Sequence, residues 1–329
     1  MKIYLASSCA PPEESPVVRA FREVAAMDKF GAHTIADSPD SADLVLFVDN
    51  HMNPDWRVRA MLEHPLLQRF PDKCMVYDER PDALGHLPGV YVSMPKQYFD
   101  ANAQRAWSYY ALKGGQPSPA KPTALYSFRG QPGQRISPAY RVRVRILKLR
   151  DDRAVIEAVK GFSFFTQLGD AAGHAAKKER YAQTLALSKF VLSPRGYATS
   201  SIRCYEVMAA GRVPVILADQ WVPPEGPDWE KFALFVPERQ VADIPEILRE
   251  AEPMWGQMSS AALAAFNQYF APDVNWHNLM EQFRILKESN PKVDPALVLR
   301  RTRNVARVQM VSKIWGEAAG MAKRVGIKK

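Results

Sequence analysis

Groups that bind anions are concentrated in the stretch SPRGYATSSIRCYEVMAAGRVPVIL, which runs from Ser193 to Leu217. Two arginines, Arg195 and Arg203, stand close to a glycine, Gly196. Arginine side chains form charge-assisted hydrogen bonds with phosphate oxygens, and glycine allows a ligand to approach the backbone closely. The stretch therefore predicts a phosphate-binding turn.

Hydroxyl and carboxylate groups complete this turn. Thr199, Ser200 and Ser201 are good residues to begin a helix. Glu206 follows Arg203 by three residues, so both project from neighbouring positions on one helix face. A carboxylate there suits the two hydroxyls of a ribose, as acidic residues do in other nucleotide sites.

A strand, a turn and a helix must position these groups. KFVLSP reads as a strand ending at Pro194, and the next strand, VPVIL, begins after Gly211, a typical residue for the end of a helix. This order places Arg195 at the carboxyl edge of a parallel sheet, where open α/β sheets bind ligands. The unpaired N–H groups of the helix start point the same way and favour anions.

Each residue also has a purely structural explanation. Arg203 and Glu206 could form a surface ion pair, and the serines could only cap the helix. The coincidence of all these groups at one strand end favours the anion site.

Two series of alternating strands and helices surround this region. The first includes Lys2–Ala6, the apolar run Leu44–Val48 and Cys74–Tyr77, and the second begins with ALYSFRG, residues 124–130. Such alternation is typical of parallel sheets. A Gly/Pro-rich linker at residues 113–122 separates the series. We therefore expect an α/β protein with two Rossmann-like domains whose parallel sheets face a central cleft, followed by C-terminal helices.

The domain boundaries expected from these patterns divide the chain into three parts. Residues 1–117 would form an acceptor-side domain, residues 118–275 a donor-binding domain, and residues 276–329 a basic helical segment. Residues 300–329 carry nine Lys or Arg and one acid, Glu317, so they hold most of the net charge of +9. Two interpretations stay open for this segment: a packed helix with a solvated basic face, or peripheral contact with an anionic membrane surface.

Several features argue for a cytoplasmic location, at most peripheral at the inner face of a membrane. No run of eighteen apolar residues is present, and the first residues read as a strand rather than a signal peptide. Three scattered cysteines, Cys9, Cys74 and Cys204, suggest neither a disulfide framework nor a zinc site. The histidines, among them His33 and His277, show no ligand spacing.

A resemblance strengthens the phosphate interpretation. Residues 192–238, with the PRG loop, the serine-rich helix start, Arg203, Glu206 and Glu238, strongly resemble the signature region of exostosin-type glycosyltransferases of family 47. YSFRG at 126–130 resembles the first strand of that family's donor domain. The resemblance implies GT-B architecture and sugar transfer with inversion from a nucleotide-sugar, UDP- or GDP-linked, to a carbohydrate or lipid-linked glycan.

The resemblance also implies roles for single residues. Arg195 and Arg203 would bind the diphosphate together with Gly196 and the three hydroxyl residues, and Glu206 would bind the ribose. Arg129 would be a further cation, and Asp219 would touch the sugar or cap a turn. No Asp-x-Asp motif occurs in the chain, so neither a metal nor a cofactor is expected. The basic run 141–153 is interpreted as a helix with a basic face, which could also border the phosphates.

Acceptor activation needs a base that faces the cleft. The candidates at strand ends of the first domain are Asp49, His51, Asp78 and Glu79. Glu79 is preferred, because Asp78 could cap the following turn.

Rival functions remain at this point. One is another GT-B enzyme, an epimerase or a phosphorylase, and another is a basic protein that binds nucleic acid or a membrane surface without catalysis. The absence of a nucleic-acid motif and the near-neutral remainder of the chain argue against nucleic acid. The favoured hypothesis is a bacterial enzyme of surface polysaccharide synthesis.

Overall fold

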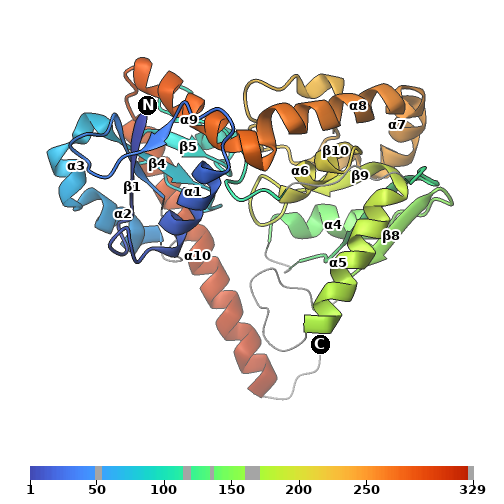
Figure 1. Cartoon of the computed structure of the whole chain (residues 1–329). Coiled ribbons are helices and arrows are strands. Elements are labelled where there is room, and N and C mark those ends of the chain that lie inside the picture. The colour runs from blue at the N-terminus through green and yellow to red at the C-terminus, as the bar shows by residue number, and fades with distance from the viewer. Residues whose placement is uncertain (49–53, 114–119, 134–136, 160–170, 325–329) are drawn as a thin grey trace.

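Two parallel sheets organise the molecule into two α/β halves, as expected (Figure 1). The computed structural model describes residues 1–48, 54–113, 120–133, 137–159 and 171–324. Asp49 and His51 lie outside the described residues, as does most of the expected linker.

The first half is built on a six-stranded sheet of order β2-β1-β3-β4-β5-β6. Its strands are β1 (Lys2–Ala6), β2 (Thr34–Ile35), β3 (Leu44–Phe47), β4 (Cys74–Asp78), β5 (Gly89–Tyr91) and β6 (Gln104–Arg105). The helices of this half are α1 (Pro16–Ala26), α2 (Pro54–Leu62) and α3 (Pro65–Arg69).

The apolar run of strand β3 is continuous because the side chains on both of its faces are buried. Leu44 and Leu46 belong to the core cluster that contains residues of α1, whereas Val45 and Phe47 pack on the other face with Met61 of α2. Both faces of the sheet are therefore covered, which is the usual condition of a parallel sheet.

The second half is built on a five-stranded sheet of order β11-β10-β9-β7-β8. Its strands are β7 (Ala124–Gly130), β8 (Ala154–Ala158), β9 (Ser188–Pro194), β10 (Val213–Leu217) and β11 (Leu234–Phe235). Its helices are α4 (Ala139–Leu147), α5 (Ala171–Ala186), α6 (Ile202–Ala209), α7 (Ile244–Ala251) and α8 (Trp255–Ala265).

The two halves are tied together by a helix that returns to the first half. After α8, a π-helical turn (Phe266–Phe270) leads into α9 (Pro272–Glu288), which packs on α1, β5 and β6. Asn275 of α9 is buried and accepts a hydrogen bond from Trp107 Nε1 at 2.9 Å. One core cluster consequently contains residues of both halves.

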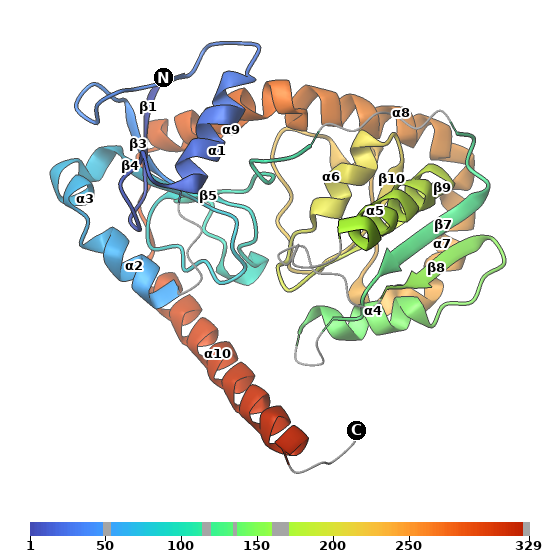
Figure 2. The same cartoon turned by 60° about the horizontal axis from the view of Figure 1, so that its bottom comes forward.

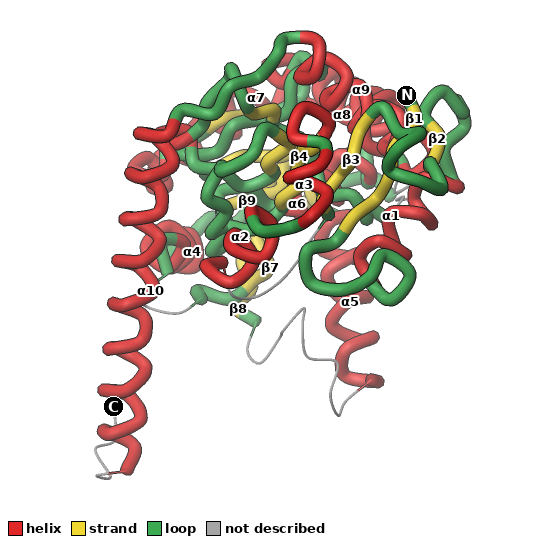
Figure 3. The backbone as a smooth tube through the Cα atoms, turned by 90° about the vertical axis from the view of Figure 1, so that its left-hand side faces the viewer, coloured by secondary structure: helices red, strands yellow, loops and turns green. Residues whose placement is uncertain are grey.

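The last helix, α10 (Pro295–Arg324), leaves the body of the molecule (Figures 2 and 3). Its beginning is anchored on the first half, because Arg301 is buried and donates hydrogen bonds to the carbonyls of Ala83 and Pro81. Across the described ranges, every helix is too short or too polar to span a bilayer.

Candidate nucleotide-sugar site

The strand order of the second sheet marks the place where a ligand is expected. Strand β7 lies between β8 and β9, so the helical connections leave β7 and β9 in opposite directions along the sheet. Open α/β sheets bind ligands outside the carboxyl ends of the strands at such a reversal. Arg129, near the end of β7, and Arg195, just after β9, lie at this point.

The turn after β9 has the predicted local structure. Helix α6 begins after Ser201, and Gly211 adopts a left-handed conformation with φ of 63° just before β10. A glycine adopts this conformation without the steric cost that a Cβ would impose. The predicted strand, helix and strand are thereby confirmed.

Arg203 is held firmly at this strand end. Its Nη2 donates to the carbonyl of Arg129 at 2.7 Å, and its guanidinium lies 4.9 Å from the ring centroid of Phe128. The ring of Tyr181 lies 5.5 Å from the same group. Arg203 is therefore fixed by a carbonyl and two aromatic rings rather than by a carboxylate.

Arg143 of α4 joins this group from the preceding helix. Its Nε donates to the carbonyl of Arg195 at 3.0 Å, and its Nη1 to that of Gln131 at 3.3 Å. Burial and the nearby positive charge of Arg203 lower the pKa of Arg143 to about 10. A buried cation beside another cation is costly unless an anion is bound there.

None of the three arginines 143, 195 and 203 has a carboxylate within ion-pair distance among the described residues. By contrast, the half-buried Arg129 pairs with Glu157 of the neighbouring strand. Three arginines without an ion-pair partner around one turn are an arrangement that favours an anion.

Gly196 leaves space beside these cations. A Cβ placed on Gly196 would meet Arg143 Nη2 at 3.8 Å and the Ala198 amide nitrogen at 4.0 Å. Its backbone does not adopt the left-handed conformation that would require glycine. The glycine therefore keeps open a space lined by a guanidinium and a backbone amide.

Arg195 and Arg203 have different surroundings. The side chain of Arg195 turns toward the carbonyl of Tyr197, 3.4 Å from its Nη2, and borders the pocket between the halves. Burial lowers its pKa, while the charges of Glu238 and Asp219 act in the opposite direction. Arg195 thus lines the pocket, whereas Arg203 is held against the end of β7.

The three hydroxyl residues divide into two kinds. Thr199 and Ser200 are buried and bind the first half: Thr199 Oγ1 donates to the Ser93 carbonyl at 2.9 Å. Ser200 Oγ lies 2.7 Å from both Ser93 Oγ and Tyr109 OH. Ser201 is the N-cap of α6, but its side chain makes no capping bond.

Glu206 and Arg203 do not form the surface ion pair considered from the sequence. Instead, Glu206 Oε2 accepts a hydrogen bond from Tyr181 OH at 2.8 Å, and the ring of Tyr181 stacks near Arg203. Tyr181 therefore orients both residues.

Asp219, which follows β10, is exposed and bonded to Glu238. Its Oδ1 accepts from the Glu238 amide at 3.0 Å, and its own amide donates to Glu238 Oε1 at 3.3 Å. Asp219 consequently links the loop after β10 to the loop after β11.

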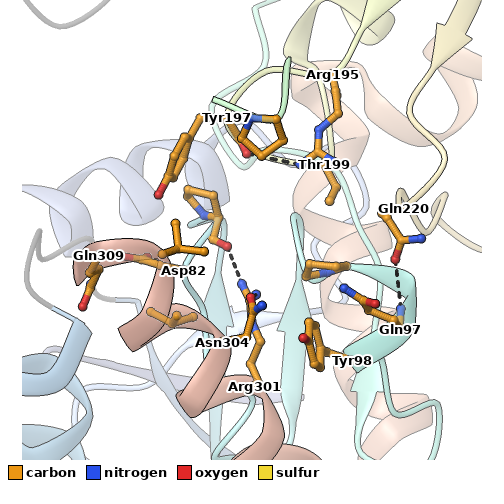
Figure 4. A pocket seen from close by; sticks show the side chains of 15 residues that line it. Asp82, Gln97, Tyr98, Arg195, Tyr197, Thr199, Gln220, Arg301, Asn304 and Gln309 are labelled. Atoms are coloured by element: carbon orange, nitrogen blue, oxygen red, sulfur yellow. Dashed lines mark hydrogen bonds between the residues drawn. The ribbon is translucent and has the colours of Figure 1, made fainter. Parts of the chain in front are cut away.

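A pocket of about 250 Å³ lies between the two halves (Figure 4). The first half contributes Asp82, Gln97 and Tyr98, and the second contributes Arg195, Tyr197 and Gln220. Helix α10 supplies one wall with Arg301, Asn304, Val305, Val308 and Gln309. Its amide and aromatic lining is suited to a polar ligand such as a sugar.

Glu79 and Asp78 lie at the end of β4 with different roles. Asp78 is buried, and its Oδ1 accepts from the Arg80 amide at 2.9 Å, which is the turn-capping contact anticipated for it. Burial, followed by the charge of Asp78, raises the pKa of Glu79 to about 7. Tyr77 OH lies 3.4 Å from Glu79 Oε2.

Several residues of the turn and of the pocket were not singled out individually from the sequence. Arg143 belongs to a basic run whose members all look alike in sequence, so nothing distinguished it from Arg141 or Arg145. Arg301 and Asn304 lie more than a hundred residues from the turn and reach the pocket only because α10 packs on the first half.

Comparison with known proteins finds a family model over the part of the chain that contains this turn. The family model described as Exostosin GT47 domain matches residues 90–251, which include the turn after β9. The chain is 43% identical over 70 residues to Exostosin-1 homolog of Caenorhabditis elegans, covering 21% of this chain and 18% of that protein. It is 24% identical over 176 residues to Probable glucuronosyltransferase GUT1 of Oryza sativa subsp. japonica, covering 44% of this chain and 42% of that protein.

A solved glycosyltransferase from Rickettsia africae is similar with a TM-score of 0.42 and 11% identity, covering 88% of this chain and 98% of that one. The chain spans less than half the length of the two curated relatives just described. Residues 90–251 therefore form a region similar to the GT47 domain of exostosin-type glycosyltransferases.

Proposed function

We propose that this protein transfers a sugar from a nucleotide-sugar to a glycan or glycolipid acceptor, with inversion at the anomeric carbon. The observation that carries the proposal is the group of three arginines, 143, 195 and 203, which have no carboxylate partner in the described part of the exostosin domain. Residues 1–117 would serve as the acceptor side, residues 118–275 as the donor domain, and residues 276–329 as the basic helical segment.

The diphosphate of the donor would lie over the turn after β9. Departure of a nucleoside diphosphate leaves negative charge that fixed cations and helix N-terminal amides can stabilise. Arg143 and Arg203 would supply this charge on one side of Gly196 and Arg195 on the other. Arg129, already paired with Glu157, would act by placing its carbonyl against Arg203.

These groups would make leaving-group stabilisation independent of a metal ion, whether the donor is UDP- or GDP-linked. Glu206, oriented by Tyr181, would accept hydrogen bonds from the ribose hydroxyls. Asp219 would contact the sugar from the loop after β10.

Glu79 would act as the base that removes the acceptor proton. A carboxylate with a pKa of about 7 is matched to proton transfer near neutral pH. Asp78 would support it as a positioning residue, because its negative charge helps to raise that pKa.

The acceptor would enter through the pocket between the halves. A carbohydrate or lipid-linked glycan fits its amide and tyrosine lining. The three exposed arginines at the start of α10, Arg300, Arg303 and Arg307, would favour peripheral contact with an anionic membrane. Such an arrangement would serve the synthesis of a bacterial surface polysaccharide.

A thermal-shift screen tests the donor proposal. UDP, GDP, CMP and their sugars are added to the purified protein, and one of the nucleoside diphosphates is expected to raise the melting temperature in a saturable manner. Arg195→Ala should abolish this shift and sharply reduce transfer, while the melting temperature without ligand changes little because the side chain borders the pocket.

The same screen separates this proposal from its rivals. If no nucleotide raises the melting temperature, and if the protein is retained on DNA in a way that falls steeply with salt, then the protein binds nucleic acid and is not a transferase. If a nucleotide stabilises the wild type and Arg195→Ala equally, it does not bind at the turn after β9.

A further inference from the structure

Three side chains that can bind a metal ion meet at the edge of the first sheet opposite the pocket. His33 precedes β2, while His277 and Glu281 are one turn apart on α9. One donor atom from each of the three residues lies within 4.8 Å of the others. The chain start and α9 lie side by side here (Figure 1).

Two imidazole rings of this cluster face one carboxylate. His33 is 6% exposed, and its Nε2 lies 2.9 Å from Glu281 Oε1. Nδ1 of His277 is buried and has no hydrogen-bond partner among the described residues. Buried polar atoms are normally satisfied, so this unpartnered nitrogen beside the contact between His33 and Glu281 needs an explanation.

We propose that His33, His277 and Glu281 bind a divalent transition-metal ion, for which Zn²⁺ is the natural choice. Two imidazole nitrogens and one carboxylate oxygen are a ligand set typical of zinc, with water in the fourth position. Ligand bonds of about 2.0–2.1 Å in a tetrahedral site separate the donor atoms by about 3.4 Å. The donor atoms of the three residues lie within 4.8 Å of one another, which is near this value.

The surroundings of the three ligands already hold them in place. Trp276 Nε1 donates to the His33 carbonyl at 3.1 Å, and the Lys29 amide donates to the Asp273 carbonyl at 3.0 Å. These two bonds fasten the loop before β2 to α9. Partners that orient ligands in this way increase metal affinity.

The second carboxylate oxygen of Glu281 and the second ring nitrogen of His33 each contact another group. Glu281 Oε2 accepts from Arg284 Nε at 2.9 Å, which leaves Oε1 for the ion. Nδ1 of His33 lies 3.3 Å from the amine of Met1.

The site would act on structure rather than on the reaction. Residue 33 precedes a strand of a parallel sheet, so it lies at the amino-terminal edge, whereas the pocket lies at the carboxyl ends. A metal ion would clip the loop before β2 to α9, the helix that joins the two halves. This inference is independent of the proposed transferase activity.

Metal binding to the full chain tests the proposal. The protein is stripped with dipicolinic acid, dialysed, and titrated with ZnCl₂ or with MgCl₂, and bound metal and melting temperature are both measured. We expect about one Zn²⁺ per chain, a melting temperature that rises with Zn²⁺, and no such rise with Mg²⁺.

Variants on the same helix identify the ligands. Glu281→Gln keeps the shape of the side chain and should weaken Zn²⁺ binding at least about tenfold. Glu288→Gln, a matched change that also removes a carboxylate bonded to Arg284, should bind Zn²⁺ as the wild type does. His277→Ala provides a second ligand variant should Glu281→Gln be poorly folded.

Two outcomes would overturn the proposal. One is the absence of saturable Zn²⁺ binding to the stripped wild type. The other is equal affinity in the wild type, Glu281→Gln and His277→Ala, which would place the ion on other groups such as the exposed Cys9.

Discussion

Replacing Gly196 with alanine tests whether the open space in the turn after β9 serves a ligand. Within the described ranges, the added methyl group meets no atom closer than Arg143 Nη2 at 3.8 Å, which is an ordinary van der Waals contact. The backbone at this position is not left-handed, so alanine causes no strain. The folded protein therefore accommodates Gly196→Ala easily.

The structure predicts opposite effects on stability and on donor binding. Alanine at a compatible position stabilises by about 0.4–1 kcal/mol, because it restricts the unfolded chain. A phosphate oxygen bonded to Arg143 or to the Ala198 amide would compete with the methyl group for the same space. Loss of one hydrogen bond to a charged group costs about 1.5–3 kcal/mol, which corresponds to a roughly 10- to 150-fold weaker affinity.

The assay compares melting temperature and nucleotide affinity for the wild type, Gly196→Ala and Gly256→Ala. Gly256 lies in α8, and a methyl group there would also meet no atom within 4 Å. We expect both variants to melt at the wild-type temperature or slightly above it. Only Gly196→Ala should bind the nucleoside diphosphate more weakly.

Wild-type nucleotide affinity in Gly196→Ala would refute this reasoning. The space beside Arg143 would then hold no part of the donor, and the three unpaired arginines would need another anion. A large loss of stability in Gly196→Ala would instead show that the glycine has a structural role.

The remaining predictions concern four side chains. Arg143→Gln should weaken nucleotide binding about 10-fold or more, with stability nearly unchanged because it also removes repulsion from Arg203; Arg145→Gln on the exposed face of α4 is the control, and equal affinities would contradict the assignment. Glu206→Gln should lower nucleotide affinity more than stability. Calorimetric titration measures the affinity and thermal melting the stability, so the two losses can be compared. Ser200→Ala should lower stability more than nucleotide affinity, because the buried Ser200 hydroxyl forms hydrogen bonds with the first half. We expect the free energy of unfolding, measured by denaturant titration, to fall by about 1–3 kcal/mol. For Glu79, kcat/KM should rise as pH increases through about 7 and the carboxylate forms; this limb should vanish in Glu79→Gln, and an unchanged profile would exclude Glu79 as the base.

Local sequence signals predicted the strand, turn and helix of the donor site well. The apolar strand ending at Pro194 and the φ of 63° at Gly211 both depend on residues within a short segment. The two parallel sheets were predicted for the same reason, since each strand is an apolar run between polar turns. Helices α5 and α8 were not predicted, because their apolar residues are spaced too irregularly to mark a face.

Long-range side-chain contacts could not be predicted in this way. Sequence reasoning assigned the hydroxyls of Thr199 and Ser200 to the donor, but the structure uses them to bind Ser93 and Tyr109 of the first half. Sequence also gave no reason to connect His33 with His277, because the two residues are 244 positions apart and only the return of α9 brings them together. Which group a hydroxyl or an imidazole faces is decided by the packing of the two halves.

The start of α6 therefore connects the donor site to the docking of the halves. On one side of this turn, Thr199 and Ser200 hold the first half, and on the other, Arg143 and Arg203 leave their charge available. A diphosphate bound over Gly196 would lie only a few residues along the chain from Thr199 and Ser200, which contact Ser93 and Tyr109. Any movement of the first half relative to the second would then alter the geometry of the anion site, so donor binding and closure of the pocket are expected to be coupled through this one turn.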